Sequence, residues 1–326
     1  MDISKKISFI GAGSIGTALA NVIASTKRTA VVLHSVEEDV VASIRSANMN
    51  RKYFPSVRLE ESIHATTDLR DLEGSELIFL AIPSIVLMEY MESIRGSIPQ
   101  QAYLVNLAKG FGKDRNTILS CLAGSFPNPL ATMKGPTFAR EIINRMPTAF
   151  TVGTKDDRIS GALRRLFEGT SVYLDYSHDA EGVEILSILK NIYAIALGIV
   201  DAQFNSPNIR FLVLTKAFRE MHSILCRFGG EESTIFLYCG YGDFTLTALN
   251  DLSRNRTLGL LIGKGFFTKP VSHELVLEGQ VAVNIFYEKI SAEKDFQKKY
   301  PILSELYRVM NHDHDLSLFI KTVLES

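Results

Sequence analysis

The sequence predicts an α/β protein in two parts, an N-terminal domain built on a parallel sheet and an all-helical C-terminal domain. First, short β-rich runs alternate with helical patterns over the first half of the chain, as in parallel strands joined by crossover helices. Second, strand-like runs largely vanish after Asp179, and long helical patterns follow. Third, 326 residues exceed what one hydrophobic core usually serves. We therefore expect domains at residues 1–180 and 181–326.

The expected strands are short, and several are apolar throughout, as strands buried on both faces should be. They are Ile7–Ile10, Ala30–Leu33, Leu77–Ile82, Tyr103–Asn106, Leu130–Met133, Thr148–Val152 and Val172–Leu174. Helical patterns at Glu37–Ser46 and Ser84–Arg95 lie between them. Those of the second domain are Ala180–Gln203, Ile209–Arg227 and Ser272–Glu288.

Composition excludes several classes of protein. The 35 basic and 36 acidic side chains nearly cancel, which gives no electrostatic reason to expect a nucleic-acid partner. A hydrophobic fraction of 46% is too high for a disordered chain. The longest apolar stretch, Ile185–Val200, is interrupted by Lys190 and Asn191 and falls short of the roughly 20 residues of a membrane span. Three scattered cysteines and the absence of a secretory signal pattern indicate a soluble cytoplasmic protein.

A glycine-rich turn follows the first expected strand. The pattern G-x-G-x-x-G, formed by Gly11, Gly13 and Gly16, lies between Ile7–Ile10 and a helical pattern. Gly11 allows the tight turn, Gly13 lets the backbone approach a pyrophosphate, and Gly16 lets the helix pack close to the strand. The helix N-terminus then offers free N–H groups to the phosphates. This context predicts a Rossmann-type dinucleotide site.

The residues after the second expected strand bear on the choice of cofactor. An acidic residue there favours the unmodified ribose of NAD, whereas an arginine would favour the 2′-phosphate of NADP. No Arg or Lys is near in His34–Glu38, and Glu37 is present, which tilts the prediction toward NAD. Glu37 is equally compatible with a first-turn position in the next helix, where the macrodipole would stabilise it.

One lysine occurs in a segment that is apolar nearly all round, Glu184–Leu197. Such a helix should be buried, and a lysine is almost never buried without a partner. Desolvation disfavours the charged form of lysine, so Lys190 is a candidate general acid or base. The alternative is that Lys190 reaches the surface from the helix edge.

Two clusters follow further along the chain. Asp243 lies in a glycine-containing turn, and Ser253-Arg254-Asn255-Arg256 combines capping side chains with arginines at a helix start. Arginines are unfavourable at that end of a helix dipole unless an anion is bound there. The second cluster is therefore either a phosphate site or an ordinary cap with solvated arginines.

Two loops follow expected strands at the sheet edge where doubly wound folds bind ligands. Lys109 follows Tyr103–Asn106, and Gly135-Pro136-Thr137 follows Leu130–Met133, with Thr137 a candidate helix cap and ligand contact. Either loop could be plain turn chemistry.

A polar stretch near the C-terminus, His312-Asp313-His314-Asp315, superficially looks like a metal cluster. It lacks an evident third ligand in a suitable arrangement, so we expect a solvated turn and no metal.

Taken together, these segments resemble the NAD(P)-dependent glycerol-3-phosphate dehydrogenases, mainly the bacterial type, nearly from end to end. The matching motifs are GAGSIGTALA (11–20), AIPS (81–84), AKG (108–110), GPTFAREI (135–142), LKNIYAIALGIVD (189–201), GYGDFTLT (240–247), SRNR (253–256), IGKG (262–265) and EG (278–279). Several motifs in the right order are far more specific than any one alone.

The resemblance implies roles for individual residues. Lys190 would be the acid–base group for the C2 hydroxyl, Asp243 would help set its charge state, and Lys109 would contact both cofactor and substrate. Substrate binding would involve Lys109, Gly135, Thr137, Asn191, Asp243, Thr247, Ser253, Arg254 and Asn255, with the phosphate at Arg254 and Asn255. Cofactor binding would involve Gly11, Gly13, Ser14, Ile15, Gly16, His34, Pro83, Lys109, Ala139, Arg254, Val276 and Glu278.

The resemblance also implies a reaction: reversible hydride transfer between NAD(P)H and the C2 carbonyl of dihydroxyacetone phosphate, giving sn-glycerol 3-phosphate. A Rossmann domain, a helical domain and a homodimer are the family's common architecture. The chain departs from the family pattern at residues 208–217, where bulkier side chains replace a Gly- and Ala-rich stretch. The alternatives are therefore a related dehydrogenase for another phosphorylated polyol or keto compound and a non-catalytic nucleotide-binding regulator. Lys190 together with Asp243 argues against the regulator.

Overall fold

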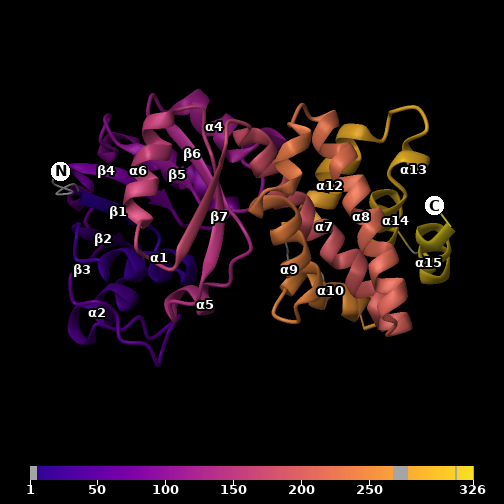
Figure 1. The fold of residues 1–326 in the computed structure, drawn as a ribbon, viewed down its shortest axis with the longest axis horizontal. Helices are drawn as coiled ribbons and strands as arrows, with labels where there is room; N and C mark the ends of the chain where they lie inside the picture. Colours follow the sequence, from indigo (N-terminus) through magenta and orange to yellow (C-terminus); the bar gives the residue numbers. More distant parts are fainter. Residues whose placement is uncertain (1–5, 267–277, 313, 326) are drawn as a thin grey trace. The chain divides into compact units, whose positions relative to one another are not determined.

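The computed structural model describes residues 6–266, 278–312 and 314–325. The chain forms two compact units, Met1–Glu184 and Ile185–Ser326 (Figure 1). Helix α7 (Ala180–Phe204) spans this division, so the chain passes from one unit to the next within a helix and without a linker.

The first unit is built on an eight-stranded sheet in the order β3-β2-β1-β4-β5-β6-β7-β8. Its strands are β1 (Lys6–Ile10), β2 (Val31–His34), β3 (Ile63–Thr66), β4 (Ser75–Leu80), β5 (Tyr103–Asn106), β6 (Leu130–Lys134), β7 (Thr148–Gly153) and β8 (Val172–Ser177). The chain leaves β1 toward β2 on one side and returns to β4 on the other, which makes the β1–β4 edge the switch point of the sheet.

Two features of the sheet differ from the sequence prediction. Strand β3 was not predicted, because it is short and His64 interrupts its apolar pattern with an exposed side chain. Strands β6 and β7 pair antiparallel, whereas a parallel sheet was expected throughout. The apolar pattern of a strand does not encode its direction, and the helix between these two strands, α5 (Ala139–Ile143), has only five residues.

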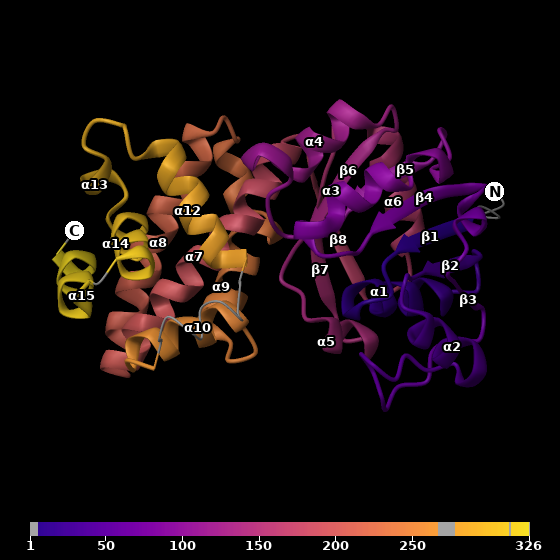
Figure 2. The ribbon, with the colours of Figure 1, turned by 180° about the vertical axis from the view of Figure 1, so that it is seen from behind.

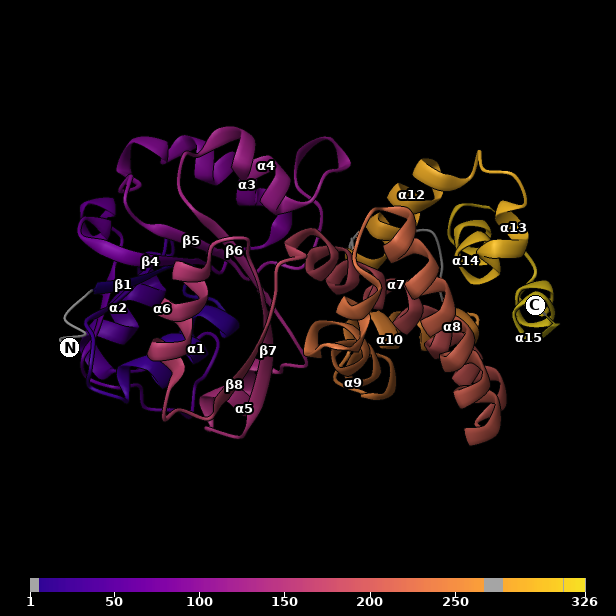
Figure 3. The same ribbon diagram turned by 45° about the horizontal axis from the view of Figure 1, so that its top comes forward.

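Helices cover both faces of the sheet (Figure 3). One buried cluster joins the sheet to α1 (Ser14–Ala24), α2 (Glu38–Ala47), α5 and α6 (Asp157–Phe167). A separate cluster joins the opposite face to α3 (Ser84–Ser93) and α4 (Ile118–Ser125). This three-layer arrangement is the doubly wound α/β fold that the alternating pattern predicts.

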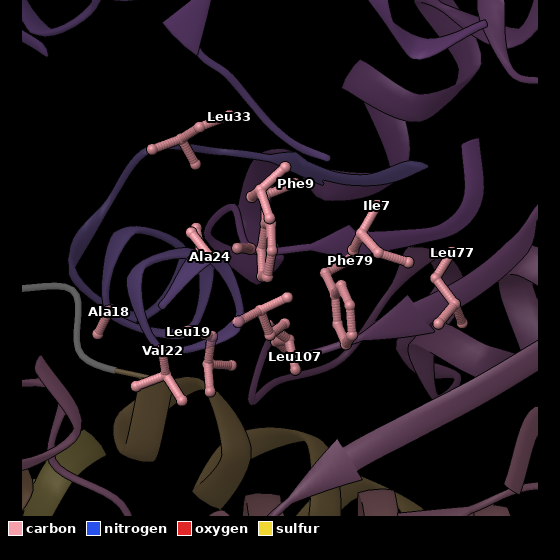
Figure 4. Close-up of a cluster of buried hydrophobic side chains, with 14 of the residues drawn as sticks. Ile7, Phe9, Ala18, Leu19, Val22, Ala24, Leu33, Leu77, Phe79 and Leu107 are labelled. Carbon is pink, nitrogen blue, oxygen red and sulfur yellow. The ribbon is translucent and has the colours of Figure 1, made fainter. Parts of the chain in front are cut away.

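The central strands divide their side chains between the two layers. Phe9 belongs to the cluster with α1, and its neighbour Ile10 belongs to the cluster with α3. The rings of Phe9 and Phe79 stack with centroids 4.7 Å apart, in the same buried cluster as Leu19 of α1 (Figure 4). Small residues on α1, such as Ala18, let that helix lie close to the strands. This packing holds the start of α1 close to the end of β1.

The second unit consists of helices, and none of its described residues forms a strand. After α7 come α8 (Pro207–Arg227), α9 (Asp243–Leu249), α10 (Arg254–Gly263), α12 (Glu278–Ile290), α13 (Phe296–Lys299), α14 (Pro301–Asn311) and α15 (Leu316–Glu325). The start expected at Ser272 for the helix now seen as α12 lies outside the described residues. Figure 2 shows α7 with α8, α10 and α12 around it.

Helix α7 is the core helix of this unit. It is long and apolar enough to cross a membrane by composition, but its most apolar window is wholly buried within the protein. A hydrogen bond from Tyr193 to Glu220, 3.0 Å, ties it to α8. Gly198 lets it approach α10, because a Cβ there would lie 2.3 Å from the carbonyl oxygen of Arg256. Burial thus explains the apolar sequence of α7 without a membrane.

Candidate functional site

The glycine turn after β1 has the geometry that a dinucleotide needs. Gly11 has φ +111°, and a Cβ there would lie 2.5 Å from the carbonyl oxygen of Ala81, so only glycine fits. A Cβ at Gly16 would lie 2.2 Å from the carbonyl oxygen of Gly11, which holds α1 close to the strand. A Cβ at Gly13 would meet nothing within 4 Å, so the turn is open on that side.

The N-terminus of α1 completes this turn. The helix begins at Ser14, which is exposed, and continues with the half-buried Ile15. Within the described residues no side chain caps the helix, so its first N–H groups are available to an anion. The residues present therefore fit a dinucleotide pyrophosphate.

The side chain of a buried asparagine, which was not predicted from the sequence, is hydrogen-bonded to the glycine turn. Asn50 donates from Nδ2 to the carbonyl oxygen of Ala12 and to Oγ1 of Thr17, both at 2.9 Å. Thr17 donates to the same carbonyl at 3.1 Å. Asn50 lies 38 positions after Ala12, so no local pattern could have assigned it to the turn.

The end of β2 presents one buried and one charged side chain. His34 is buried, and desolvation lowers the pKa of its imidazole. Glu37 is the N-cap residue of α2, one position before the first turn in which one alternative placed it, and its carboxylate pairs with Lys52 at 2.8 Å. The segment His34–Glu38 itself holds no Arg or Lys, but the fold brings the ammonium group of Lys52 to this carboxylate. Lys52 arrives from the segment after α2, 15 positions along the chain from Glu37.

The loops after β5 and β6 meet at one carbonyl group. Lys109 Nζ donates to the carbonyl oxygen of Gly135 at 3.2 Å, and Thr137 Oγ1 donates to the same oxygen at 3.3 Å. A Cβ at Gly135 would lie 2.2 Å from the carbonyl oxygen of Ala149, so the loop presses against β7. The structure therefore brings Lys109, Gly135 and Thr137 together.

One detail of the β6 loop corrects the sequence prediction. Phe138, not Thr137, occupies the N-cap position of α5, and it makes no side-chain cap. The Thr137 hydroxyl bonds to Gly135 instead, because the chain enters the short helix one residue later than expected. Ala139 is the first residue of α5, and Pro83 directly precedes α3.

In the second unit, Lys190 is buried and paired. Its side chain is 6% exposed, and Nζ lies 2.5 Å from Oδ1 of Asp243 and 3.0 Å from Oγ1 of Thr247. Lys190 does not extend along the helix to the surface. Asp243 begins α9 after a π-helical turn, Tyr238–Gly242, of a kind often found at functional sites.

The two arginines at the start of α10 have different environments. Ser253 caps the helix by accepting a hydrogen bond from the backbone N–H of Arg256 at 3.3 Å. Arg256 is buried and pairs with Asp201 at 2.5 Å and with Asp251 at 3.3 Å. Arg254 is exposed, and no ion pair involves it within the described part of the chain. Arg254 can therefore bind an external anion, whereas Arg256 is a structural residue.

Next to Arg254, one polar atom has no partner in the described structure. Oδ1 of Asn255 is buried and accepts no hydrogen bond from the residues that the structure describes. A Cβ at Gly279 would lie 2.6 Å from this atom and 3.1 Å from the carbonyl oxygen of Asn191. Asn191 and Asn255 thus meet at the start of α12, directly after Glu278. A buried orphan acceptor calls for a donor from a ligand or water.

Val276 lies outside the described residues. We expected a solvated turn at residues 312–315. This prediction is wrong for His314, whose side chain is only 15% exposed and lies 2.7 Å from the buried carboxylate of Glu305. No group of potential ligands for a metal ion occurs among the described residues.

Comparisons with known proteins cover nearly the whole chain. Family models described as the N-terminus and the C-terminus of NAD-dependent glycerol-3-phosphate dehydrogenase match residues 6–160 and 179–321. The glycerol-3-phosphate dehydrogenase (NAD(P)+) of Methanothermobacter thermautotrophicus is 35% identical, covering 98% of this chain and 97% of its own length. That of Clostridium botulinum, strain Eklund 17B, is 32% identical with the same coverage. The crystal structure of the Coxiella burnetii enzyme superimposes with a TM-score of 0.88 at 29% identity, covering 99% of each chain.

Proposed function

This chain belongs to the NAD-dependent glycerol-3-phosphate dehydrogenase family, and we propose that Lys190 is the acid–base group of its reaction. The reaction is the NAD(P)H-dependent reduction of dihydroxyacetone phosphate to sn-glycerol 3-phosphate. One observation carries the role of Lys190: a buried ammonium group held 2.5 Å from the buried carboxylate of Asp243. A buried pair of oppositely charged titratable groups is a feature that many active sites share.

The turn after β1 is our candidate for the pyrophosphate site of the cofactor. We propose that the phosphates bind the backbone of Gly11, Gly13, Ser14, Ile15 and Gly16. When bound, the reduced cofactor supplies the hydride that is added to the C2 carbonyl carbon. The other proposed cofactor residues are His34, Pro83, Lys109, Ala139, Arg254, Val276 and Glu278.

Lys190 is suited to donate a proton to the C2 oxygen as that oxygen gains negative charge. The carboxylate of Asp243 favours the protonated form of the lysine, which is the form that reduction requires. Thr247 accepts a second hydrogen bond and so limits the directions that Nζ can take. After the transfer Lys190 is neutral and must regain a proton from solvent. In the oxidative direction the neutral lysine removes the proton from the C2 hydroxyl.

The substrate phosphate requires positive charge and N–H donors. We propose that exposed Arg254 and the N-terminus of α10 provide them, with Ser253 and Asn255 at the same helix start. Asn191 lies beside Asn255 at Gly279 and belongs to the same cluster. The proposed remaining substrate contacts are Lys109, Gly135, Thr137, Asp243 and Thr247.

Cofactor preference and assembly are further proposals. We propose that NAD is preferred over NADP, because Lys52 is already neutralised by Glu37. A cytoplasmic location is supported by three free cysteines. A homodimer is supported by exposed apolar side chains on α8, Phe211 and Leu212. Sedimentation of the purified protein would test the homodimer.

An assay of purified protein with dihydroxyacetone phosphate tests the proposal, with NADH and NADPH run side by side. Turnover should be observed with both cofactors and should be faster with NADH. Turnover only with another phosphorylated keto compound would establish the related-dehydrogenase alternative. Nucleotide binding without turnover on any substrate would establish the regulator.

A further inference from the structure

We propose that a buried ion pair, Lys134 with Glu184, positions the two loops that carry Lys109 and Gly135. The pair itself would not contact substrate. It lies at the carboxyl ends of β5 and β6, where ligands bind in doubly wound sheets. The inference rests on the substrate role proposed for Lys109.

Both charges are removed from water. The exposed fractions of the side chains are 0% for Lys134 and 2% for Glu184, and Nζ lies 3.7 Å from Oε1. Such a pair needs additional hydrogen bonds to offset its desolvation. Glu184 receives them from Oγ1 of Thr132 at 2.9 Å and from the backbone N–H of Leu119 at 3.0 Å. Lys134 donates to the carbonyl oxygen of Asn106 at 3.0 Å.

Asn106 connects this pair to the Lys109 loop. Its Nδ2 donates to Oε1 of Glu184, and its Oδ1 accepts the backbone N–H of Ala108 at 2.9 Å. The amide is therefore held at both ends, and its orientation depends on the acceptor that Glu184 provides. Because Ala108 directly precedes Lys109, the orientation of the Asn106 amide sets the course of the backbone that carries the lysine.

Lys134 connects the pair to the second loop. It is the last residue of β6 and directly precedes Gly135, whose carbonyl oxygen accepts from Lys109 at 3.2 Å. Anchoring Lys134 to Asn106 therefore sets the position of the carbonyl group that holds the Lys109 ammonium. Both loops are therefore connected by hydrogen bonds to the same buried ion pair, Lys134 with Glu184.

Stability alone does not explain such a pair. Replacing a buried ion pair by apolar side chains of similar volume is often neutral or stabilising. A charged pair kept at the ligand-binding edge of the sheet is better explained by the geometry that it imposes on the loops. A positioning role predicts that variants of the pair change the KM independently of the melting temperature.

The test compares variants of the full-length protein by KM for dihydroxyacetone phosphate, kcat, NADH affinity and melting temperature. Glu184→Gln should raise the KM roughly three- to tenfold, the size of effect expected when a hydrogen bond of this network is lost. It should also weaken NADH binding, because Lys109 is a proposed contact of both substrate and cofactor. Thr132→Val weakens the same carboxylate more gently and should raise the KM in the same direction, which keeps the test available if Glu184→Gln does not fold. The double variant Lys134→Met/Glu184→Met should regain melting temperature but not the normal KM.

Asn128→Ala is the matched control for lost stability. Asn128 is a buried amide at the amino ends of the same two strands, where Nδ2 donates to the carbonyl oxygen of Ala102 at 2.8 Å. Its removal should lower the melting temperature and leave the KM unchanged. The positioning role would be overturned if the KM rose in every variant in proportion to the loss of melting temperature. It would also be overturned if the double variant had the KM of the wild type.

Lys109→Met separates this inference from the proposed function. An increased KM in Lys109→Met with an unchanged KM in Glu184→Gln and Thr132→Val overturns the inference alone. An unchanged KM in Lys109→Met overturns the substrate role of Lys109, and the inference with it.

Discussion

The Nζ atom of Lys190 and the Oδ1 atom of Asp243 lie 2.5 Å apart, with both side chains almost fully buried. Lys190 is on α7 and Asp243 begins α9, so the pair joins two helices far apart in the sequence. Taking two charges out of water costs several kcal/mol per ion before their attraction offsets it. The pair therefore holds the proposed proton donor against a carboxylate in a site shielded from solvent.

Replacing Lys190 by Ala should lower kcat by about 100- to 10,000-fold, the usual contribution of general acid–base catalysis. Binding of NADH, followed by its fluorescence, should persist because the glycine turn is intact. Lys321→Met, which removes an exposed lysine of α15, is the control and should leave kcat unchanged. Near-normal turnover in Lys190→Ala would rule out the assigned role.

The two arginines of α10 should give opposite phenotypes. Arg254→Gln should raise the KM for dihydroxyacetone phosphate roughly 10- to 100-fold, because a charge-assisted hydrogen bond is lost, with little change in melting temperature. Arg256→Gln should lower the free energy of unfolding. Removing one partner of a buried ion pair usually costs about 3–5 kcal/mol, and the loss should be smaller here because Asp201 keeps its pair with Arg210 at 2.7 Å. Kinetics and thermal unfolding of both variants check this. A KM effect confined to Arg256→Gln would show that the phosphate site is elsewhere.

These contrasts indicate what the sequence could predict. The glycine turn follows from local spacing and was predicted. The apolar pattern around Lys190 predicted a buried helix but left open whether the lysine itself reaches the surface. The partners of His314 and Glu37 were not predicted, because Glu305 and Lys52 reach them only through the fold. Apolar patterns locate strands but do not encode their direction, so the antiparallel β6–β7 pair was missed.

Lys52 should affect cofactor choice when its partner is removed. Glu37→Gln frees the Lys52 ammonium beside the end of β2, where it can attract a 2′-phosphate. The ratio of kcat/KM with NADPH to that with NADH should rise roughly two- to fivefold, since both side chains are partly exposed. Lys52→Met should lower the same ratio. Arg58→Gln is the control, because Arg58 is an exposed residue of the same segment that pairs with Glu61 instead. A ratio that is equal in all three variants would contradict the prediction.

Glu220 should make the stability of the protein depend on pH. Burial raises the pKa of its carboxyl group to about 8, although the hydrogen bonds from the backbone N–H groups of Ile302 and Leu303 and from Tyr193 oppose the shift. Between its ordinary value of 4.5 and about 8, the folded protein holds a proton that the unfolded chain releases. The contribution of this group to stability therefore falls as the pH rises through that window and changes little above it.

Glu220→Gln copies the neutral carboxyl group and cannot release a proton. The melting temperature of the wild type minus that of Glu220→Gln should therefore decrease from pH 5 to pH 8. Circular dichroism melts at several pH values measure this difference. Glu288→Gln is the control on the exposed face of α12, and its difference from wild type should stay constant over the same range. A difference for Glu220→Gln that is constant or grows with pH would mean that the carboxyl group is ionised in the folded protein.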